Sequence, residues 1–300
     1  MPELPEVQTT VKGLNAKVLK RTFIDVWSDW EKIIHLRQGY GGQVKKQDFN
    51  EFKQKIRGKK IKKIWRRAKN IIFDLSDNYS LLVHQKMTGH LLVGKWSLKE
   101  KKWEPVKRGP LDEKINLFIH VLFFLDNGQM IALSDVRKFA KVELWETEDL
   151  LNSEEFKNLG PEPLERGFTF GKLKECLKNK KGKIKQVLMD PYIIAGIGNI
   201  YSNEALWWSK INPQKNTLKL TEKELKLLYQ SIKKVLLAGI KLGGESFSDY
   251  RNVEGKKGHF DDERKVYKRE KEKCARCKTI ITRLKFGGRS AFFCPNCQRL

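Results

Sequence analysis

Long apolar runs are missing from this sequence of 300 residues. The longest unbroken ones, such as Val121 to Leu125, fall far short of the roughly 20 residues that a membrane-spanning helix needs. The amino end reads Met-Pro-Glu-Leu-Pro-Glu, with neither a basic start nor an apolar stretch, so no secretory signal is visible. We therefore expect no membrane association and no export, and we expect the protein in the cytoplasm.

Acidic residues are also scarce relative to basic ones. Asp and Glu total 36 against 61 Lys and Arg, which gives a formal net charge of +25. The basic residues cluster: ten of the 17 residues from Lys53 to Lys69 are basic, and none is acidic. A surplus of charge can serve solubility alone, but clustered Lys and Arg gain free energy from phosphate contacts through counterion release. Nucleic acid is therefore the expected partner, and the 40% of apolar residues predict a folded chain.

Residues 1–148 are predicted to form a β-sandwich or flattened barrel. Apolar and polar residues alternate, and Asp126-Asn127-Gly128 is a strong hairpin signal. One face of a strand is expected to carry Leu117, Ile119, Val121, Phe123 and Leu125. The polar stretch 95–114 is expected to be a loop. A Pro-Glu segment such as the amino end more often forms a turn.

In residues 149–250 the spacing of the apolar residues changes to that of an α-helix. Ser153 precedes one expected helix, and Thr221 with Glu224 forms a capping box before another, which should end at Gly239 or at Gly243-Gly244. Residues 251–300 begin with a highly charged segment, which we interpret first as a solvated connection. The sequence therefore predicts an α+β multidomain fold.

Cysteine is rare, yet four of the five cysteines share the spacing C-x2-C-x16-C-x2-C: Cys274, Cys277, Cys294 and Cys297. Each pair can bind one metal from a tight turn, and four thiolates complete a tetrahedral zinc site. Two disulfides are the alternative, but without an export signal the compartment should be reducing. With four Cys ligands the site is closed, so we predict one structural zinc ion in a zinc ribbon.

The sequence between the two cysteine pairs can form a hairpin about Gly287-Gly288, which places Arg289 at its tip. A rigid finger that presents an arginine is suited to contact a phosphate or a lesion in a groove. An ordinary surface arginine is the equal alternative. Cys176, the fifth cysteine, is expected to be a small core residue.

The amino end carries a candidate nucleophile. Removal of Met1 would leave the secondary amine of Pro2 at the chain terminus, and an α-amino group titrates near pH 8. A useful fraction would be neutral and able to attack an electrophilic carbon, while Glu3 and Glu6 could transfer protons.

Several motifs, read together, resemble the bacterial formamidopyrimidine-DNA glycosylases, which remove oxidised purines in base-excision repair. The likeness covers essentially the whole chain in order. The motifs that carry it are the cysteine spacing and the segments Pro2 to Val7, His84 to Gly89, Asp135 to Phe139, Leu159 to Leu164, Gly196 to Tyr201, Val266 to Glu270 and Gly288 to Pro295. The resemblance implies a β-sandwich domain, a helix–two-turn–helix domain and a zinc ribbon.

The resemblance also implies catalytic roles. Pro2 would attack C1′ of the damaged nucleoside and form a Schiff base, with Glu3 as general acid/base and Glu6 as a supporting carboxylate. Lys69 would contact phosphate and assist proton transfer. Arg289 would grip phosphate at the lesion and take part in the later elimination. The strand would then be cut by β- and δ-elimination.

Further residues match positions that contact DNA in this family. Because the damaged base must leave the duplex before an amine can reach C1′, a hole remains in the stack. Met87, Arg137 and Phe139 match the residues that fill it, although without the family Met87 and Phe139 would more often be core residues. The other expected DNA contacts are His84, His120, Lys180, Lys185 and Asn199. The segment Gly255 to Phe260 resembles the family's loop over the everted base.

Some positions depart from the family pattern. In Leu117-Phe118-Ile119-His120 only His120 matches a Lys-His-x-His stretch, Lys268 replaces a glycine, and Gln85 replaces a leucine.

The resemblance implies a bacterial, nucleoid-associated monomer that acts on damaged double-stranded DNA. Two alternatives stay open. One is an endonuclease VIII-like glycosylase for oxidised pyrimidines, and the other is a zinc-stabilised protein that binds damaged DNA without cutting it.

Overall fold

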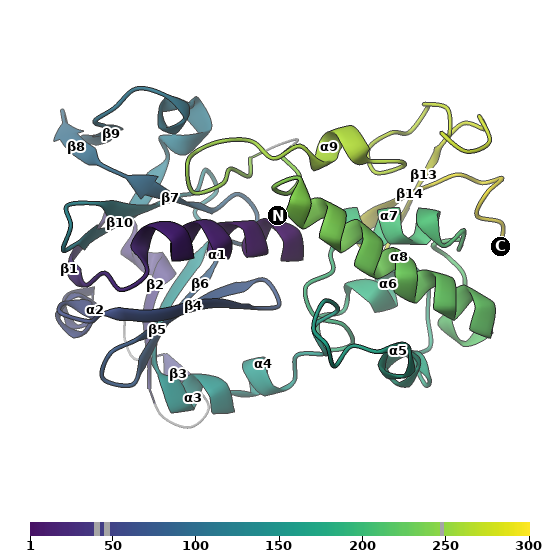
Figure 1. Ribbon diagram of the computed structural model, residues 1–300, viewed down its shortest axis with the longest axis horizontal. Helices are drawn as coiled ribbons and strands as arrows, with labels where there is room; N and C mark the ends of the chain where they lie inside the picture. The colour runs from purple at the N-terminus through teal and green to yellow at the C-terminus, as the bar shows by residue number, and fades with distance from the viewer. Residues whose placement is uncertain (39–42, 45–48, 247–248) are drawn as a thin grey trace. The chain divides into compact units, whose positions relative to one another are not determined.

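The computed structural model describes residues 1–38, 43–44, 49–246 and 249–300 (Figure 1). These residues fold into two compact units. Unit 1 comprises residues 1–2, 6–158 and 243–259, and unit 2 comprises residues 3–5, 159–242 and 260–300. The finer division at residues 148 and 250 stays a prediction.

Unit 1 is built on two β-sheets. The four-stranded antiparallel sheet has the order β1 (Phe23–Ser28), β10 (Ile119–Leu125), β11 (Met130–Ser134) and β7 (His90–Gly94). The six-stranded sheet has the order β3 (Gln43–Val44), β2 (Ile34–Gln38), β12 (Lys141–Glu146), β6 (Tyr79–His84), β5 (Asn70–Leu75) and β4 (Ile61–Arg67). Inward-facing residues of both sheets form one apolar cluster, so the predicted β-sandwich is confirmed.

Among the described residues of 1–148, where we expected mainly strands, three α-helices accompany the strands: α1 (Leu4–Val18), α2 (Phe49–Ile56) and the start of α3 (Thr147–Asn152). The amino end is therefore helical after Pro2 and Glu3, and not a turn. The apolar stripe Val7, Val11, Leu14 and Val18 has helical spacing and packs into the sandwich core. That stripe is the signal that sequence reasoning missed.

The prediction of a loop over residues 95–114 was wrong. This stretch contains the hairpin of β8 (Trp96–Lys99) and β9 (Lys102–Pro105) and two short 3-10 helices, η2 (Pro110–Asp112) and η3 (Lys114–Asn116). Trp96 is buried, and the ring of Trp103 packs 5.5 Å from that of Trp27. Burial of large aromatic surface anchors a segment whose other residues are polar.

The predicted apolar face of residues 117–125 is interrupted. A bulge shifts the register of β10 between Ile119 and Val121. Val121, Phe123 and Leu125 therefore face the sandwich core, whereas Ile119 joins a separate cluster with Leu122. The side chain of Leu117 is 44% exposed.

Unit 2 combines a group of helices with the cysteine hairpin. Its principal elements are α5 (Phe170–Leu177), α6 (Ile184–Met189), α7 (Asn199–Trp208), η4 (Thr217–Lys219), α8 (Glu222–Lys241), α9 (Phe260–Glu263), β13 (Thr282–Phe286) and β14 (Arg289–Phe293). In Figure 1, α7 and α8 lie beside each other within this unit. The short α4 (Glu154–Lys157) follows Ser153 as expected, but it belongs to unit 1.

The predicted capping box at the start of α8 is confirmed. Thr221 Oγ1 accepts from the Glu224 backbone, and Glu224 Oε2 accepts from the Thr221 backbone at 2.8 Å. The helix ends before Gly243, whose φ of +76° is left-handed, and not at Gly239. A methyl group at Gly239 would lie 2.5 Å from Tyr201 Oη, so this glycine permits the close approach of α7 and α8.

The charged segment after residue 254 is not simply solvated. Gly258 is buried, and its backbone N–H donates to Ser246 Oγ at 2.8 Å. A methyl group at Gly258 would lie 2.2 Å from the carbonyl oxygen of Gly244. The glycine is therefore needed for two chain segments of unit 1 to approach.

Candidate functional site

In unit 2, the carboxylate of Glu3 is bound at the amino end of α7. Its two oxygens accept backbone N–H groups from Gly198 at 2.9 Å, Ile200 at 2.8 Å and Tyr201 at 3.3 Å. The first N–H groups of a helix have no partner within the helix, and the positive end of the helix dipole favours an anion. Glu3 is only 2% exposed. The candidate acid/base residue is therefore fixed in position, and it directly follows Pro2 in the chain.

A buried lysine lies beside this helix start. Lys185 Nζ, on α6, donates to Asn199 Oδ1 at 2.6 Å and to Ser202 Oγ at 3.1 Å. Burial lowers the pKa of Lys185 to about 7, and the positive charge of Arg289 acts in the same direction while Glu3 opposes it. The structure thus brings together Lys185 and Asn199, two of the residues predicted to contact DNA. Ser202, which lies three residues after Asn199 on the same helix, joins this group and was not predicted from the sequence.

Arg289 lines a pocket with this lysine. The pocket measures about 300 Å³ and is bordered by α6 and the β13–β14 hairpin, with Lys185, Gln186, Met189, Asp190, Phe286, Gly287 and Arg289 around it. Two cationic side chains and one carboxylate therefore surround a space open to solvent. Such a pocket can accept an anionic oxygen group.

The hairpin turn confirms the predicted position of Arg289. Gly287 and Gly288 have φ values of +55° and +69°, as a tight type I′ turn requires. Arg289 follows them as the first residue of β14, and its side chain is exposed. A methyl group at Gly287 would lie 2.2 Å from Gln186 Nε2 on α6, so a larger residue here would displace the end of that side chain.

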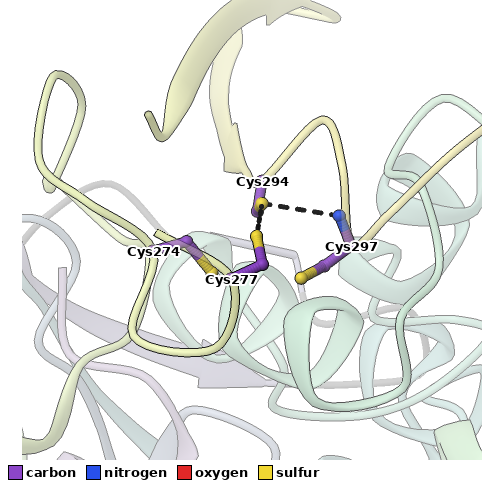
Figure 2. Close-up of side chains that lie close together, drawn as sticks. All are labelled: Cys274, Cys277, Cys294 and Cys297. Atoms are coloured by element: carbon purple, nitrogen blue, oxygen red, sulfur yellow. Dashed lines mark hydrogen bonds between the residues drawn. The ribbon is translucent and has the colours of Figure 1, made fainter. Parts of the chain in front are cut away.

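The four cysteines of the predicted metal centre converge (Figure 2). Their sulfur atoms all lie within 4.8 Å of one another, and Cys277 Sγ is 3.4 Å from Cys294 Sγ. Zn–S bonds of about 2.3 Å in a tetrahedron separate the sulfurs by about 3.8 Å, so the group fits zinc. All four thiols are free, which excludes the two disulfides considered above.

The zinc centre is joined to α7 and the chain after it. Gln298 Oε1 accepts from the Cys294 backbone, and its Nε2 donates to the Ile211 carbonyl, both at 2.9 Å. Asn203 Oδ1, on α7, accepts from the backbone of Phe292 at 2.9 Å. The hairpin that carries the cysteine cluster is therefore attached to the same helix that holds the Glu3 carboxylate.

Unit 1 contains Pro2, Glu6 and Lys69. Glu6, on α1, is buried and accepts the backbone N–H of Glu245 at 2.7 Å. A methyl group at Gly244 would lie 2.8 Å from Glu6 Cγ. Pro2 is buried, and Lys69 lies half-buried in the turn between β4 and β5.

His84 ends β6, immediately before the turn that carries Met87. Its Nδ1 accepts the backbone N–H of Lys86 at 2.9 Å. Burial lowers the pKa of His84 to about 3, and Lys86, Lys69 and Lys141 add to this effect through their charges. The ring is therefore neutral near pH 7 and supports the turn through its lone pair.

The three residues predicted to fill the hole in DNA are exposed. Met87 is 37% and Phe139 52% accessible, so neither is a core residue in unit 1. Arg137 is also exposed, and its guanidinium carbon lies 4.6 Å from the centre of the Phe139 ring. An exposed methionine and an exposed cation–π pair are available for contact with another molecule.

The other two predicted DNA contacts differ from each other. Lys180 is exposed in the turn after α5. His120 is 7% exposed, and its Nδ1 lies 2.8 Å from Asp29 Oδ1. The ring of His120 thus has a partner inside unit 1.

Comparison with known proteins matches the chain in three segments. Residues 1–142 match the formamidopyrimidine-DNA glycosylase N-terminal domain, residues 159–251 the H2TH domain of the same enzymes, and residues 271–300 the zinc finger found in FPG and IleRS. The match and the cysteine geometry together confirm the predicted structural zinc. They also confirm the α+β fold with a β-rich, a helical and a zinc-finger part.

Similar proteins cover the full chain. A formamidopyrimidine-DNA glycosylase of Pelotomaculum thermopropionicum is 37% identical over 100% of both chains, and one of Desulfitobacterium hafniense is 36% identical over 99% of this chain and 100% of its own. A structure of Lactococcus lactis Fpg with DNA containing an abasic site has a TM-score of 0.84 and 32% identity, covering 99% of this chain and 100% of that one. The chain belongs to the formamidopyrimidine-DNA glycosylase family.

Among the residues that the structure describes, no helix combines the length and apolar character needed to cross a membrane.

Proposed function

We propose that this protein is a base-excision repair enzyme that removes oxidised purines from duplex DNA and then cuts the strand at the abasic site. The proposal rests mainly on the position of the Glu3 carboxylate, which is buried at the amino end of α7 and belongs to the residue directly after Pro2. Solved relatives are bound to DNA containing an abasic site, Fapy-dG or carbocyclic 8-oxo-G, which supports purine lesions over pyrimidine ones.

The proposed reaction begins after removal of Met1. The lone pair of the Pro2 nitrogen attacks C1′, the bond from C1′ to the base breaks, and the base leaves with a proton. Opening of the sugar ring gives an iminium ion that joins Pro2 to C1′. Loss of a C2′ proton then sends electrons toward the iminium and expels the 3′ phosphate, which is β-elimination; δ-elimination expels the 5′ phosphate. Glu3 is positioned to move protons in the early steps.

Other residues are assigned supporting roles. Lys69 and Arg289 are proposed to hold backbone phosphates, together with Lys180, Lys185 and Asn199 on the helical unit. Met87, Arg137 and Phe139 are proposed to occupy the hole left by the everted base. His84 would support the turn that carries Met87. His120 is proposed to contact DNA through the small part of its side chain that is exposed. Glu6 would hold the chain at Glu245.

The zinc ion serves structure. It is held by Cys274, Cys277, Cys294 and Cys297, and its closed shell leaves no position for a substrate. We propose that the protein acts as a monomer in the bacterial cytoplasm, associated with the nucleoid. Its curated relatives are bacterial.

A paired cleavage assay tests the choice of substrate. We expect strand cleavage of an 8-oxoguanine:cytosine duplex to be much faster than cleavage of a thymine glycol duplex of the same sequence. The opposite order would favour an endonuclease VIII-like enzyme. Salt-sensitive binding to both duplexes without cleavage would favour a damage-binding protein, and intact mass would show whether Met1 had been retained.

A further inference from the structure

Two turns of unit 1 carry the proposed hole-filling residues. Met87 lies in the turn between β6 and β7, and Arg137 and Phe139 lie in the turn between β11 and β12. The two turns lie far apart in the sequence. A hydrogen bond between Thr88 and Asp135 joins them across 47 positions. Both side chains of this link are buried, with Asp135 at 0% and Thr88 at 7% exposure.

The Asp135 carboxylate organises its own turn. Oδ2 accepts the backbone N–H groups of Phe139 and Ala140, each at 2.8 Å, and Oδ1 accepts that of Arg137 at 3.2 Å. A buried carboxylate is stable only when donors compensate for its lost hydration. The backbone at residues 137–140 is therefore held around this one side chain. This fixes the backbone positions from which the side chains of Arg137 and Phe139 project.

Thr88 connects the second turn to the same carboxylate. Its hydroxyl donates to Asp135 Oδ1 and accepts the Arg137 backbone N–H at 3.2 Å. The neighbouring residue also requires close packing: a methyl group at Gly89 would lie 2.6 Å from the Gln85 carbonyl oxygen and 3.2 Å from Ala140 Cβ. The two turns thus touch through a hydrogen-bonded pair and through a glycine.

The interior of unit 1 anchors Thr88 from the other side. Its carbonyl oxygen lies 3.2 Å from His90 Nδ1, and His90 Nε2 lies 2.8 Å from Asn116 Oδ1. Asn116 Nδ2 in turn donates to the carbonyl of Pro110 at 2.7 Å. Thr88 is therefore held by its main chain as well as by its hydroxyl, so it can act as a fixed support for the second turn.

We propose that Thr88 and Asp135 are positioning residues that join Met87, Arg137 and Phe139 into one wedge before DNA binds. The proposal rests on the proposed function, because it assumes that these three residues fill the hole in the duplex. Movement of one turn without the other would remove one of the two donors to Asp135 Oδ1 and would leave the Thr88 hydroxyl without its bonds to Asp135 and Arg137. Preassembly lowers the ordering cost of inserting three side chains at once.

The variants Thr88→Val and Asp135→Asn test this link. Thr88→Val keeps the shape of the side chain and removes the hydroxyl, whereas Thr88→Ser keeps the hydroxyl. Ser80→Ala is a matched control, because Ser80 is also fully buried in unit 1 and its hydroxyl bonds to Thr147 at 3.0 Å, away from both turns.

The first readout is amide hydrogen exchange of the free protein. We expect Thr88→Val to speed exchange at Arg137, Phe139 and Ala140 by about tenfold, the typical effect of losing a hydrogen bond to a charged group. Thr88→Ser and Ser80→Ala should leave these amides at native rates. Faster exchange confined to residues 86–89 would overturn the proposed coupling.

The second readout is single-turnover excision. For Thr88→Val and Asp135→Asn we expect the rate on an 8-oxoguanine:cytosine duplex to fall by about ten- to a hundredfold. Borohydride trapping on a single-stranded abasic oligonucleotide should change by less than about twofold, because no duplex hole has to be filled.

These outcomes separate the inference from the proposed function. A native protein that forms no adduct with either DNA overturns the proposed function and the wedge with it. Native activity combined with normal excision by Thr88→Val overturns the wedge alone. If Thr88→Ser is as slow as Thr88→Val, or if single-stranded trapping falls in parallel with excision, the pair serves general stability and the inference is wrong.

Discussion

A methyl group on Gly198 would lie 2.4 Å from the Cδ atom of Glu3. The absence of a side chain at Gly198 is what lets the Glu3 carboxylate reach the backbone N–H groups at the start of α7. Helix starts are usually capped by a side chain of the N-cap residue itself, but here a carboxylate 195 positions earlier in the chain does so. The link matters because it fixes the residue that follows the proposed nucleophile.

Gly198→Ala should therefore displace Glu3. We expect the free energy of unfolding to fall by about 1–3 kcal/mol, as for other overpacked sites. The adduct between the protein and abasic DNA should also decrease. Gly167→Ala is the control in the same unit, because a methyl group at Gly167 would meet no atom within 4 Å. Equal trapping by both variants, measured with equal amounts of folded protein, would contradict the role of the Glu3 position.

Lys185 should make DNA binding depend on pH. Its pKa of about 7 means that the ammonium form predominates below neutrality and the neutral amine above it. We expect native affinity for an abasic duplex to fall between pH 6 and pH 8.5. Lys185→Met should weaken binding at pH 6 by about tenfold, as for loss of one charge-assisted hydrogen bond, and should have little effect at pH 8.5. A constant effect across this range would show that Lys185 does not titrate there.

His84 should make the stability of unit 1 fall in mild acid. Its pKa is about 3 in the folded protein against 6.5 in the reference state, so between these values the unfolded chain binds a proton that the folded chain does not. The contribution is fully present above pH 6.5 and decreases by up to about 1.4 kcal/mol per pH unit as the pH falls toward 3. Urea unfolding at pH 7.5 and 5.5 should show a smaller loss for His84→Gln than for the native protein. An identical loss in both would argue against a ring that stays neutral in the folded protein.

Removal of zinc should unfold the β13–β14 hairpin and release its attachment to α7. We expect one zinc per chain in the native protein and in Cys176→Ser, because Cys176 lies on α5 outside the cluster of four. Cys297→Ser should retain little metal. Elemental analysis gives the stoichiometry, and the Phe292 amide, which donates to Asn203, should exchange faster once a chelator is added. Unchanged exchange at Phe292 in the metal-free protein would contradict this coupling.

The zinc centre and the turn between α6 and α7 could be predicted because their signals are local in sequence. Two Cys pairs with fixed spacing define the first, and Gly196 to Asn199 between two helical stretches define the second. The order of the sandwich strands followed no such local signal. The bulge at Ile119 and the burial of Trp103 against Trp27 depend on partners that are distant in the chain.

The candidate site shows the same limit. Motif resemblance selected Glu3, Lys185 and Arg289, and the structure places all three in unit 2. The motif resemblance did not show that Glu3 caps α7, since that contact depends on tertiary folding. Asp135 and Thr88 lie inside motifs that we had recognised, yet a short polar side chain gives no sign in sequence that it will be buried with four hydrogen-bond donors.

The most direct test of the account is borohydride trapping on an 8-oxoguanine:cytosine duplex, with protein whose intact mass shows that Met1 is removed. The account predicts a covalent adduct whose peptide map places the DNA on Pro2, and a strongly reduced adduct for Pro2→Gly. Salt-sensitive binding of the same duplex without any adduct, or an adduct on another residue, would contradict it.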